Sequence, residues 1–396
     1  MKKYLLPALL VLALAVLAAC GSDDESIVLR VGESLGAEGD FITAAGERFT
    51  ALHPHVTIEF VNVEVGQANS QMAIDGPAGV GPDVFVAPHD QLGALQAGGL
   101  VLPVPAGRVN HVRNQVLGAA ATGATFDGTL FGYPIATETY AIFYNRDLIA
   151  TADIPTTFDG LVSWVANFNS TNPGMHGFLF EPGGAFFTIL FTTMDGNRLF
   201  GPQGTDATSP NLNTPAAIRG MEFMRSLRPI LDVPAGDLDG GFLDGAFAAG
   251  QAAMLLTGPW NIAPFTNAGL NFGTAAIPAL PGETTPPASF GGVRTAFVSA
   301  FSENVEYAHM FAEFLTTNEI QQLRYDMTGA LPSISMQMDD PVLDGLLRQM
   351  NYAFPMPSIP QMGSFWDAMS AASANIWDGL DVTSQMDMVQ TTVLGG

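Results

Sequence analysis

Cysteine is almost absent from this chain: Cys20 is the only one in 396 residues. A fold held by disulfides needs cysteines in pairs, and a catalytic thiol is expected in the body of a domain, beside a histidine or another base. Cys20 meets neither condition, because it closes an apolar run at the start of the chain. The sequence therefore argues against both a disulfide scaffold and thiol catalysis.

Basic residues are scarce as well. The chain has 14 Lys and Arg against 38 Asp and Glu, which gives a formal net charge of −24. A surface that binds a polyanion needs a basic patch, because its affinity comes from releasing the counterions of the phosphates. Nucleic acid is therefore disfavoured as a partner, and anionic lipid headgroups are disfavoured for the same reason. The charged fraction of 13%, beside 47% hydrophobic residues, is typical of a packed chain and not of a disordered one.

Signatures of catalysis and of cofactor binding are also missing. The chain contains no Gly-x-Ser-x-Gly elbow, Walker loop, dinucleotide glycine fingerprint or His-Glu-x-x-His motif. His53 and His55 flank Pro54 and could in principle hold a metal ion, although a loop at the end of a helix is the commoner setting for such a pair. We therefore expect a protein that is not an enzyme and that has neither a cofactor nor a metal site.

The start of the chain has the layout of a secretory signal peptide. Lys2 and Lys3 precede an uncharged run from Tyr4 to Ala19. This run is short for a membrane span, and no basic stop-transfer cluster follows it. The quartet LAAC, which ends on Cys20, resembles the bacterial lipobox, in which cleavage before the cysteine is accompanied by attachment of lipid to it. We expect a signal peptide over 1–19, a lipid anchor on Cys20 and a polar tether over 20–26; the alternative is an uncleaved anchor helix with an incidental cysteine.

Alternating strand and helix patterns follow the tether. IVLRV, VTIEFVNV and GPDVFVAP are typical of short strands, and DFITAAGERFTAL, between the first two, has apolar residues at helical spacing. Strands separated by helices indicate a parallel sheet with helices on its faces, which is an α/β architecture. The length suffices for two ordinary domains, and no long Pro/Ser-rich linker follows residue 26.

Several carboxylates stand among aromatic or apolar residues. Asp90 directly follows the third strand, and open α/β sheets bind their ligands beyond the carboxyl ends of strands. Aromatic rings stack on the C–H faces of sugars, and carboxylates accept hydrogen bonds from pairs of hydroxyl groups. Taken singly, each acid could be a helix cap or a surface residue, and each tryptophan could belong to the core. Together they form a coherent sugar-binding set: Asp90, Glu138, Glu181, Phe186, Trp260, Trp366 and Asp367.

Four stretches resemble the corresponding segments of the maltose/maltodextrin-binding proteins of ATP-driven sugar importers. They are GPDVFVAPHDQLGALQAGGLVLPV, FDGTLFGYPIATETYAIFYNRDLI, AFAAGQAAMLLTGPWNI and PMPSIPQMGSFWDAM. The resemblance runs in order from about Ile27 to about Leu380. GPD followed by HD, YPIAxE with YNxDL, and IPQM before FW are its most specific parts, whereas TGPW is shared more widely among extracytoplasmic sugar-binding proteins.

The resemblance implies a periplasmic-binding-protein-like fold. Two α/β lobes, each a mainly parallel sheet flanked by helices, would be joined by three chain crossings. The first lobe would use residues 27–136 and 292–335, and the second 140–290 and 340–396. A ligand would lie in the cleft and be enclosed as the lobes rotate about crossings near 136–139 and 291–294. The family also implies a monomer, lipid-anchored outside the cytoplasm or periplasmic, that delivers an oligosaccharide to the membrane permease of an ABC transporter.

The match at the level of single residues is selective. Ala87 stands where the family has a stacking tryptophan, Gln91 where an arginine follows HD, and Ser370 where a further arginine is usual. Asp367 replaces an aromatic residue, and Phe186 follows a Gly-Gly-Ala stretch that displaces another. The scaffold is therefore closer to the family than the chemistry of its subsites, which predicts an α-linked gluco-oligosaccharide that need not be maltose. Six positions match sugar-contacting residues of the family: Asp90, Glu138, Glu181, Trp260, Met356 and Trp366.

Two other classes of function stay open on the residues alone. Paired carboxylates with aromatic residues also describe a glycoside hydrolase, which needs two carboxyl groups about 5 to 10 Å apart across the scissile bond. A different solute, such as a polyol, a peptide or a metal ion, could occupy the cleft. The four tryptophans and the acids favour a sugar, and the scarcity of arginine disfavours a phosphate or carboxylate ligand.

Overall fold

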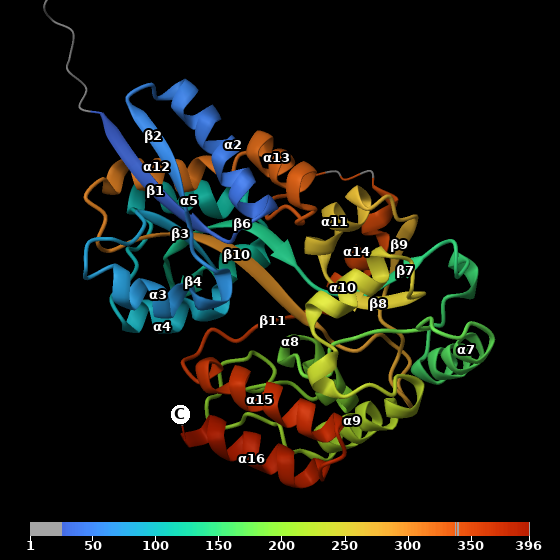
Figure 1. Ribbon diagram of the computed structural model, residues 1–396. Coiled ribbons are helices and arrows are strands. Elements are labelled where there is room, and N and C mark those ends of the chain that lie inside the picture. Colours follow the sequence, from blue (N-terminus) through green and yellow to red (C-terminus); the bar gives the residue numbers. More distant parts are fainter. Residues whose placement is uncertain (1–25, 337, 339, 396) are drawn as a thin grey trace, which may run out of the picture.

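The computed structural model describes residues 26–336, 338 and 340–395. These residues form two α/β lobes that meet along a long central strand (Figure 1). The predicted signal peptide (1–19), the predicted lipid site Cys20 and the tether up to residue 25 lie outside the described residues. Within the described range, no helix has both the length and the apolar character that a membrane crossing would require.

The larger sheet belongs mainly to the first lobe and has the strand order β11-β10-β3-β1-β2, with β6 also paired to β10. A separate hairpin and a three-stranded sheet with the order β8-β7-β9 complete the strands. The strands of the larger sheet are β1 (Ile27–Glu33), β2 (Val56–Asn62), β3 (Val84–Pro88), β6 (Gly132–Glu138), β10 (Phe290–Val298) and β11 (Phe354–Pro355). The others are β4 (Thr125–Phe126), β5 (Thr129–Leu130), β7 (Ala141–Asn145), β8 (Met254–Thr257) and β9 (Phe272–Ala275).

The larger sheet is mixed and the three-stranded sheet is antiparallel, since β10 in the larger sheet is antiparallel to both β3 and β6. β1 pairs in parallel with both β2 and β3, as the alternation of strands and helices in the sequence predicts. In the second lobe, β7 is antiparallel to both β8 and β9, so the expectation of a mainly parallel sheet is wrong for this lobe. Strand direction depends on where the intervening chain re-enters the sheet: β8 and β9 both re-enter antiparallel to β7, whereas single parallel bridges join the segment at His176 and Leu179 to the β8 region.

Helices cover the sheets of both lobes. In the first lobe they are α2 (Ala37–Leu52), α3 (Ala68–Asp75), α4 (Leu92–Ala97), α5 (Ala106–Gln115), α6 (Gly118–Gly123), α12 (Val305–Phe314) and α13 (Asn318–Thr328). In the second lobe they are α7 (Phe158–Thr171), α8 (Ala185–Thr188), α9 (Pro215–Ser226), α10 (Gly240–Ala248), α11 (Ile262–Asn267), α14 (Asp344–Met350), α15 (Met362–Trp377) and α16 (Val382–Gly395). Helices α15 and α16 lie side by side at the C-terminus (Figure 1).

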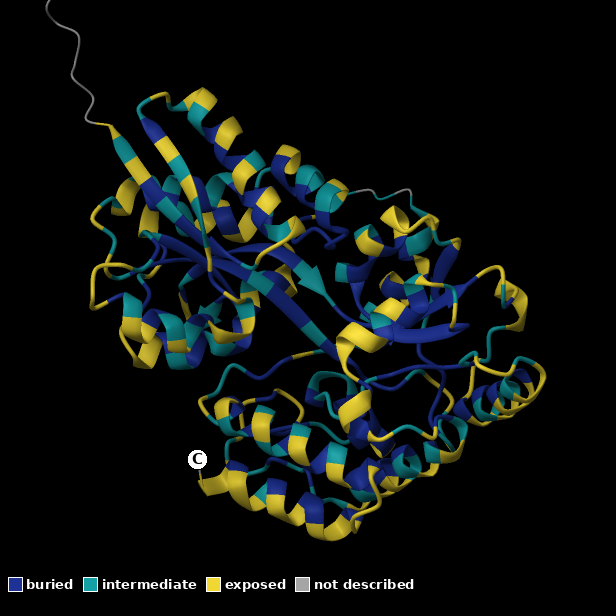
Figure 2. Ribbon diagram, in the orientation of Figure 1, coloured by how far each residue is buried: buried dark blue, intermediate teal, exposed yellow. Residues whose placement is uncertain are grey.

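Local sequence explains where these helices begin and end. α2 buries Phe41, Ala45 and Phe49, which share one face at a spacing of four residues, and it stops before Pro54. The side chain of Thr157 accepts a hydrogen bond from a backbone N–H in the first turn of α7, which is the usual role of an N-cap threonine. Exposed residues lie mainly on the outer helix faces, and the strands are largely buried apart from β2 and the start of β1 (Figure 2).

The buried cores follow the two lobes. One apolar cluster draws on residues of the second lobe, from Tyr140 to Phe290 and again from Leu331 to Val393. Two others draw on β1, β2, β3 and the strands and helices packed around them. The residue boundaries of the lobes stay a prediction; the division of the cores supports them except at Leu331, which packs in the second core although the prediction places it in the first lobe.

β6 and β10 run between the lobes. β6 ends at Glu138, two residues before the core of the second lobe begins, and β10 runs from Phe290 in that core to Val298 in the first lobe. The two strands are antiparallel, and their register shifts between Arg294 and Thr295. An irregularity of this kind commonly redirects a side chain beside a functional site. Here it lies where the two lobes join.

Candidate functional site

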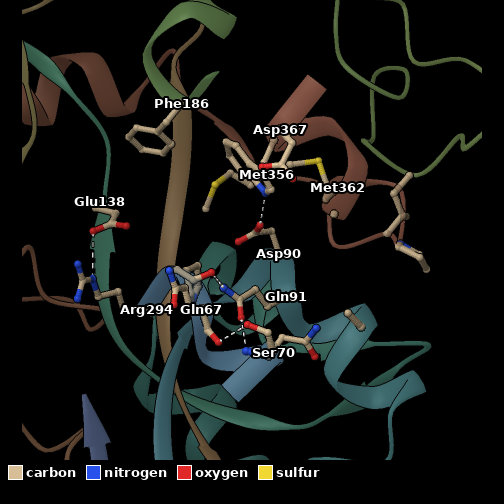
Figure 3. Close-up of a pocket in the computed structure, with 18 of the residues that line it drawn as sticks. Gln67, Ser70, Asp90, Gln91, Glu138, Phe186, Arg294, Met356, Met362 and Asp367 are labelled. Carbon is tan, nitrogen blue, oxygen red and sulfur yellow. Dashed lines mark hydrogen bonds and ion pairs between the residues drawn. The ribbon is translucent and has the colours of Figure 1, made fainter. Parts of the chain in front are cut away.

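A cavity of about 950 Å³ lies between the lobes. Its walls combine residues from β3, β6, β10, α3 and α4 with residues from α8, α15 and the segment that precedes α15 (Figure 3). The residues that line it are Gly66, Gln67, Asn69, Ser70, Pro88, Asp90, Gln91, Ala94, Glu138, Phe186, Trp260, Arg294, Met356, Ile359, Pro360, Met362, Gly363, Trp366 and Asp367.

The structure brings together most of the residues that the sequence singles out. Glu181 is the exception, because it is absent from the lining of this cavity. The other seven predicted residues line it, although they come from segments far apart in the chain: Asp90, Glu138, Phe186, Trp260, Met356, Trp366 and Asp367. Their role in binding stays a prediction, which their convergence supports.

Asp90 connects the two lobes directly. It lies in the short helix η2 (His89–Gln91) at the carboxyl end of β3, and only 7% of it is exposed. Its Oδ2 accepts a hydrogen bond of 3.1 Å from Trp366 Nε1, while its Oδ1 is buried without a partner in the described part of the chain. Burial raises the pKa of Asp90 to about 6, because the carboxylate loses more hydration than the indole N–H returns.

The neighbouring His89 is neutral and structural. Burial lowers the pKa of its ring to about 4. Its Nδ1 accepts a hydrogen bond of 3.1 Å from the backbone N–H of Val293, so this residue ties the end of β3 to the strand that runs between the lobes. The His89-Asp90 pair thus divides into one residue that ties β3 to β10 and one that lines the cavity.

A buried ion-pair network lies beside the cavity. Arg294, at the irregularity of β10, contacts carboxylate oxygens of Glu138 and Glu33 at 3.3 Å and of Glu38 at 3.5 Å. Arg324 pairs with the same Glu38 at 2.6 Å. Burial opposes the charge on Arg294, but the three carboxylates outweigh it and raise the pKa of the guanidinium. Arg294 and Glu138 also line the cavity, so the network presents a fixed charged edge to a ligand.

Aromatic residues of the second lobe form the opposite face. Phe186 and Trp260 lie with their ring centroids 6.1 Å apart, and Trp366 packs at 5.6 Å from Phe290. The Trp260 ring lies directly over Gly258, where an added Cβ would come within 2.1 Å of it. Only glycine allows this approach, so a larger residue at position 258 would displace the Trp260 ring.

The departures from the family pattern have different structural consequences. Ala87 is fully buried in a core cluster and does not line the cavity, so its small size leaves no exposed gap there. Ser370 Oγ accepts a hydrogen bond of 3.3 Å from the backbone N–H of Ala185, which fixes the start of α8. Gln91 lines the cavity, but its side-chain amide is engaged by the protein.

Glu181 belongs to a separate acidic group. Burial raises the pKa of Glu181, and the nearby Asp244 and Asp239 raise it further. Burial also raises the pKa of Asp244 to about 6, although Asn261 Nδ2 donates a hydrogen bond of 2.7 Å to it. The aromatic surroundings that single out Glu181 in the sequence are thus those of a partly buried acid outside the cavity.

Metal binding finds no support among the described residues. No group of three or more His, Cys, Asp or Glu residues lies close enough together there to hold a metal ion. His55 Nε2 instead makes a 2.8 Å hydrogen bond with Tyr307 Oη, and the ring of His53 packs on Phe49. The pair that flanks Pro54 therefore belongs to the packing of α2 and α12.

Several lining residues escape prediction from sequence. Arg294 interrupts the otherwise uncharged strand FGGVRTAFV, and a lone arginine in a buried strand of a basic-poor chain is a signal that could have identified it. Gln67, Asn69 and Ser70 lie five to eight residues after the end of β2, so the rule of strand carboxyl ends indicates their region but not the individual residues. Ile359, Pro360, Met362 and Gly363 carry no comparable signal, because their place depends on how the segment before α15 crosses the cleft.

The chain is similar to proteins that bind solutes. The family model for bacterial extracellular solute-binding proteins matches residues 33–322. A galactooligosaccharide-binding protein of Bacillus subtilis (strain 168) is 28% identical and is matched over 96% of this chain and 93% of its own. A maltotriose-binding protein of Pyrococcus abyssi is 28% identical over 82% of this chain and 72% of its own. A maltooligosaccharide ABC transporter solute-binding lipoprotein of Streptococcus pneumoniae (strain ATCC BAA-255 / R6) is 27% identical over 75% and 72%.

Solved structures that superpose on this chain include proteins that bind oligosaccharides. A cyclo/maltodextrin-binding protein complexed with maltotetraose superposes with a TM-score of 0.78 at 29% identity, covering 94% of this chain and 97% of that one. The Thermus thermophilus maltotriose binding protein bound with maltotriose superposes with a TM-score of 0.84 at 25% identity, covering 93% and 99%. The two-lobed fold predicted from the sequence is confirmed by these neighbours.

Proposed function

Because the chain belongs to the bacterial extracellular solute-binding protein family, we propose that it captures a maltodextrin-type oligosaccharide in the cavity between its lobes. Members of this family bind solutes and are not enzymes. The chain is therefore a binding protein, and we reject the glycoside hydrolase hypothesis. Maltotriose- and maltodextrin-binding relatives support the sugar class.

The observation that carries the proposal is the division of the cavity lining. One face offers Asp90, Glu138 and Arg294, and the other offers Phe186 and Trp260. A sugar ring has hydroxyl groups at its edge and C–H groups on its faces, so it can hydrogen-bond to the first face and stack on the second. Ligands without hydroxyl groups would leave the buried polar groups unpaired, which disfavours them.

Closure around the ligand requires a hinge, and the strands between the lobes are candidates. Thr139 Oγ1 donates a 2.9 Å hydrogen bond to the carbonyl of Phe290, which joins two of the predicted crossings. We expect the lobes to rotate about residues 136–139 and 291–294, with ligand contacts to both lobes favouring the closed form. The lobes would then comprise residues 27–136 and 292–335, and 140–290 and 340–396.

The cellular setting is the second part of the proposal. We expect the protein to be a monomer. A lipid on Cys20 would attach it to the outer face of the cell membrane, beside the permease of an ABC transporter that receives the sugar. The lipoprotein relative from Streptococcus pneumoniae supports this arrangement. Metabolic labelling with a radioactive fatty acid tests the anchor: label should enter the wild-type chain and not the Cys20→Ala variant.

Calorimetric titration tests the ligand. The chain from Ser26 onwards would be titrated with glucose, maltose, maltotriose, longer and cyclic maltodextrins, galactooligosaccharides, trehalose and sucrose. We expect saturable binding of α-linked glucans, and chromatography of the sugars afterwards should show no turnover. A folded protein that binds none of the glucans would contradict the proposal.

A galactooligosaccharide is the second candidate. The relative of Bacillus subtilis that carries this name is matched over nearly the full length of both chains. Saturable binding of galactooligosaccharides with no response to maltotriose would favour this candidate over the first.

A further inference from the structure

We propose that Gln91 is a positioning residue that locks one wall of the cavity and thereby sets the affinity for oligosaccharides long enough to reach that wall. The proposal rests on the proposed function, in that the ligand is an oligosaccharide. The wall is the segment 65–70, formed by the short helix η1 (Val65–Gln67) and the start of α3. Gly66, Gln67, Asn69 and Ser70 of this segment line the cavity.

Both the oxygen and the nitrogen of the Gln91 side-chain amide form hydrogen bonds with this wall. Its Oε1 accepts a 2.9 Å hydrogen bond from the backbone N–H of Asn69. Its Nε2 donates to the carbonyls of Val65 at 3.0 Å and Gly66 at 3.1 Å. A primary amide has two N–H donors, and both are used here, so Gln91 has no donor left for a ligand hydroxyl.

The wall has few other anchors: Ser34 Oγ accepts a 3.1 Å hydrogen bond from the Val65 N–H, and Ala68 is the one buried residue between 65 and 70. None of the residues of η1 is buried, and no side chain within the segment caps either η1 or α3. The first N–H groups of a helix lack partners within the helix, and the Asn69 N–H is one of these at the start of α3. Gln91 supplies the missing acceptor from another part of the chain, in the place of a local N-cap.

The wall lies at a distance from the aromatic end of the cavity. Figure 3 shows Gln67, Ser70 and Gln91 gathered on one side of Asp90 and Phe186 on the other. A short ligand stacked on Phe186 therefore need not reach the wall, whereas a longer one must pass Asp90 and contact it. Loosening the wall should penalise only the longer ligand, since segments with few buried contacts open at low cost in free energy.

Gln91→Glu is the most direct test. The carboxylate keeps the size of the side chain and can still accept from Asn69, but it places a negative oxygen against the carbonyls of Val65 and Gly66 in place of a donor. Gln96→Glu is the matched control. Gln96 is exposed on α4, and its substitution adds the same charge five residues away from Gln91. Gln91→Met, which removes donors and acceptor together, serves as a second variant without the added charge.

The first readout is the ratio of two affinities, measured by calorimetry on the full chain in a detergent without a sugar headgroup. In Gln91→Glu we expect the affinity for maltotetraose to fall at least tenfold and that for maltose less than twofold, with Gln91→Met following the same pattern. The control should change neither. Equal losses for both sugars, or no loss for either, would overturn the positioning role.

The second readout needs no sugar. Hydrogen–deuterium exchange of the peptide spanning residues 63–72 should be at least tenfold faster in Gln91→Glu than in the wild type or in Gln96→Glu. Unchanged exchange overturns the proposal, whatever the ligand. Faster exchange in a protein that binds none of the glucans would support the role of Gln91 in the wall and count against the proposed function alone.

Discussion

The two lobes present different chemistry to the cavity between them. The first lobe contributes carboxylates, an arginine and amides, and none of its lining residues is aromatic. The second contributes Phe186, Trp260 and Trp366, with the thioethers of Met356 and Met362. Asp367 is the one charged residue on the second lobe's side of the described cavity.

The two faces of the cavity are held by different forces. Phe186 packs on Tyr140 and Trp260, and Trp366 packs on Phe290 and Phe365, so the aromatic face is built by packing within the second lobe. Charged groups at the other face are stabilised by their own network, in which Arg294 balances Glu138, Glu33 and Glu38. In the proposed closure a stacking surface would meet a hydrogen-bonding surface, and the Trp366–Asp90 bond joins the two.

Among these predictions, breaking the ion pairs of Arg294 on the polar side should have the largest effect, a loss in the free energy of unfolding. Arg294→Met leaves Glu33, which is fully buried, and Glu138 without their main cation. Removing one partner of a buried ion pair typically costs about 3–5 kcal/mol of unfolding free energy, because the remaining charge stays uncompensated. Urea denaturation followed by tryptophan fluorescence would measure this loss.

The control for this prediction is a pair on the surface. Arg48 and Glu319 are 3.0 Å apart with side chains 43% and 73% exposed. Because solvent screens such a pair, Arg48→Met should lower the unfolding free energy by about 0.5 kcal/mol or less. Equal losses of unfolding free energy in the two variants would show that the buried ion pairs stabilise the protein no more than the surface pair does.

On the aromatic side, Trp366→Ala should have the largest effect on binding. It removes a stacking surface and also the donor to Asp90. Together these should cost about 3 kcal/mol, or a little over a hundredfold in affinity, for whichever sugar the titration identifies.

Trp366→Phe separates the two contributions to that loss. It keeps an aromatic ring and loses the hydrogen bond, so we expect a loss of about tenfold in affinity. If Phe is as damaging as Ala in the same calorimetric titration, the hydrogen bond and not the ring dominates, and the division between the lobes is less sharp than the lining residues indicate.

The pH dependence of stability should reveal the buried Asp90. Its pKa is raised from 3.8 to about 6 in the folded protein, so its stabilising contribution is complete below pH 3.8 and is lost as the pH rises through 6. Between pH 7.5 and pH 5 this amounts to about 1 kcal/mol of unfolding free energy, gained on acidification.

Asp90→Asn should remove this gain. His89, whose pKa is lowered, contributes with the opposite sign in both proteins, so the comparison with the wild type cancels it. Urea denaturation at the two pH values would measure the difference. Identical pH dependence in the wild type and the variant would place the titration elsewhere.

Glu181→Gln should have the smallest effect. Glu181 lies outside the cavity lining, so the affinity for the bound sugar should change less than twofold in the same titration. A loss of tenfold or more would return Glu181 to the binding site and show that the cavity extends further in the liganded form.

Much of the fold follows from local pattern, and the limits of that inference have a physical cause. The strands β1, β2 and β3 and the helix α2 coincide with alternating and helical hydrophobic spacing. The antiparallel pairing of β7 does not follow from its composition, because strand direction depends on the path of the intervening chain. The lone arginine of β10 stands out in the sequence, but its three carboxylate partners come from distant segments, which local pattern does not bring together.

By itself, the sequence determined that the protein is acidic, poor in cysteine and basic residues, built of alternating strands and helices, and provided with acids and aromatic residues suited to a sugar. These are properties of composition and of short-range order. Only the tertiary structure decided that seven of the eight predicted site residues share one cavity while Glu181 does not, and that Gln91 faces the wall with both ends of its amide. Those facts depend on contacts between residues far apart in the chain, which local pattern does not specify.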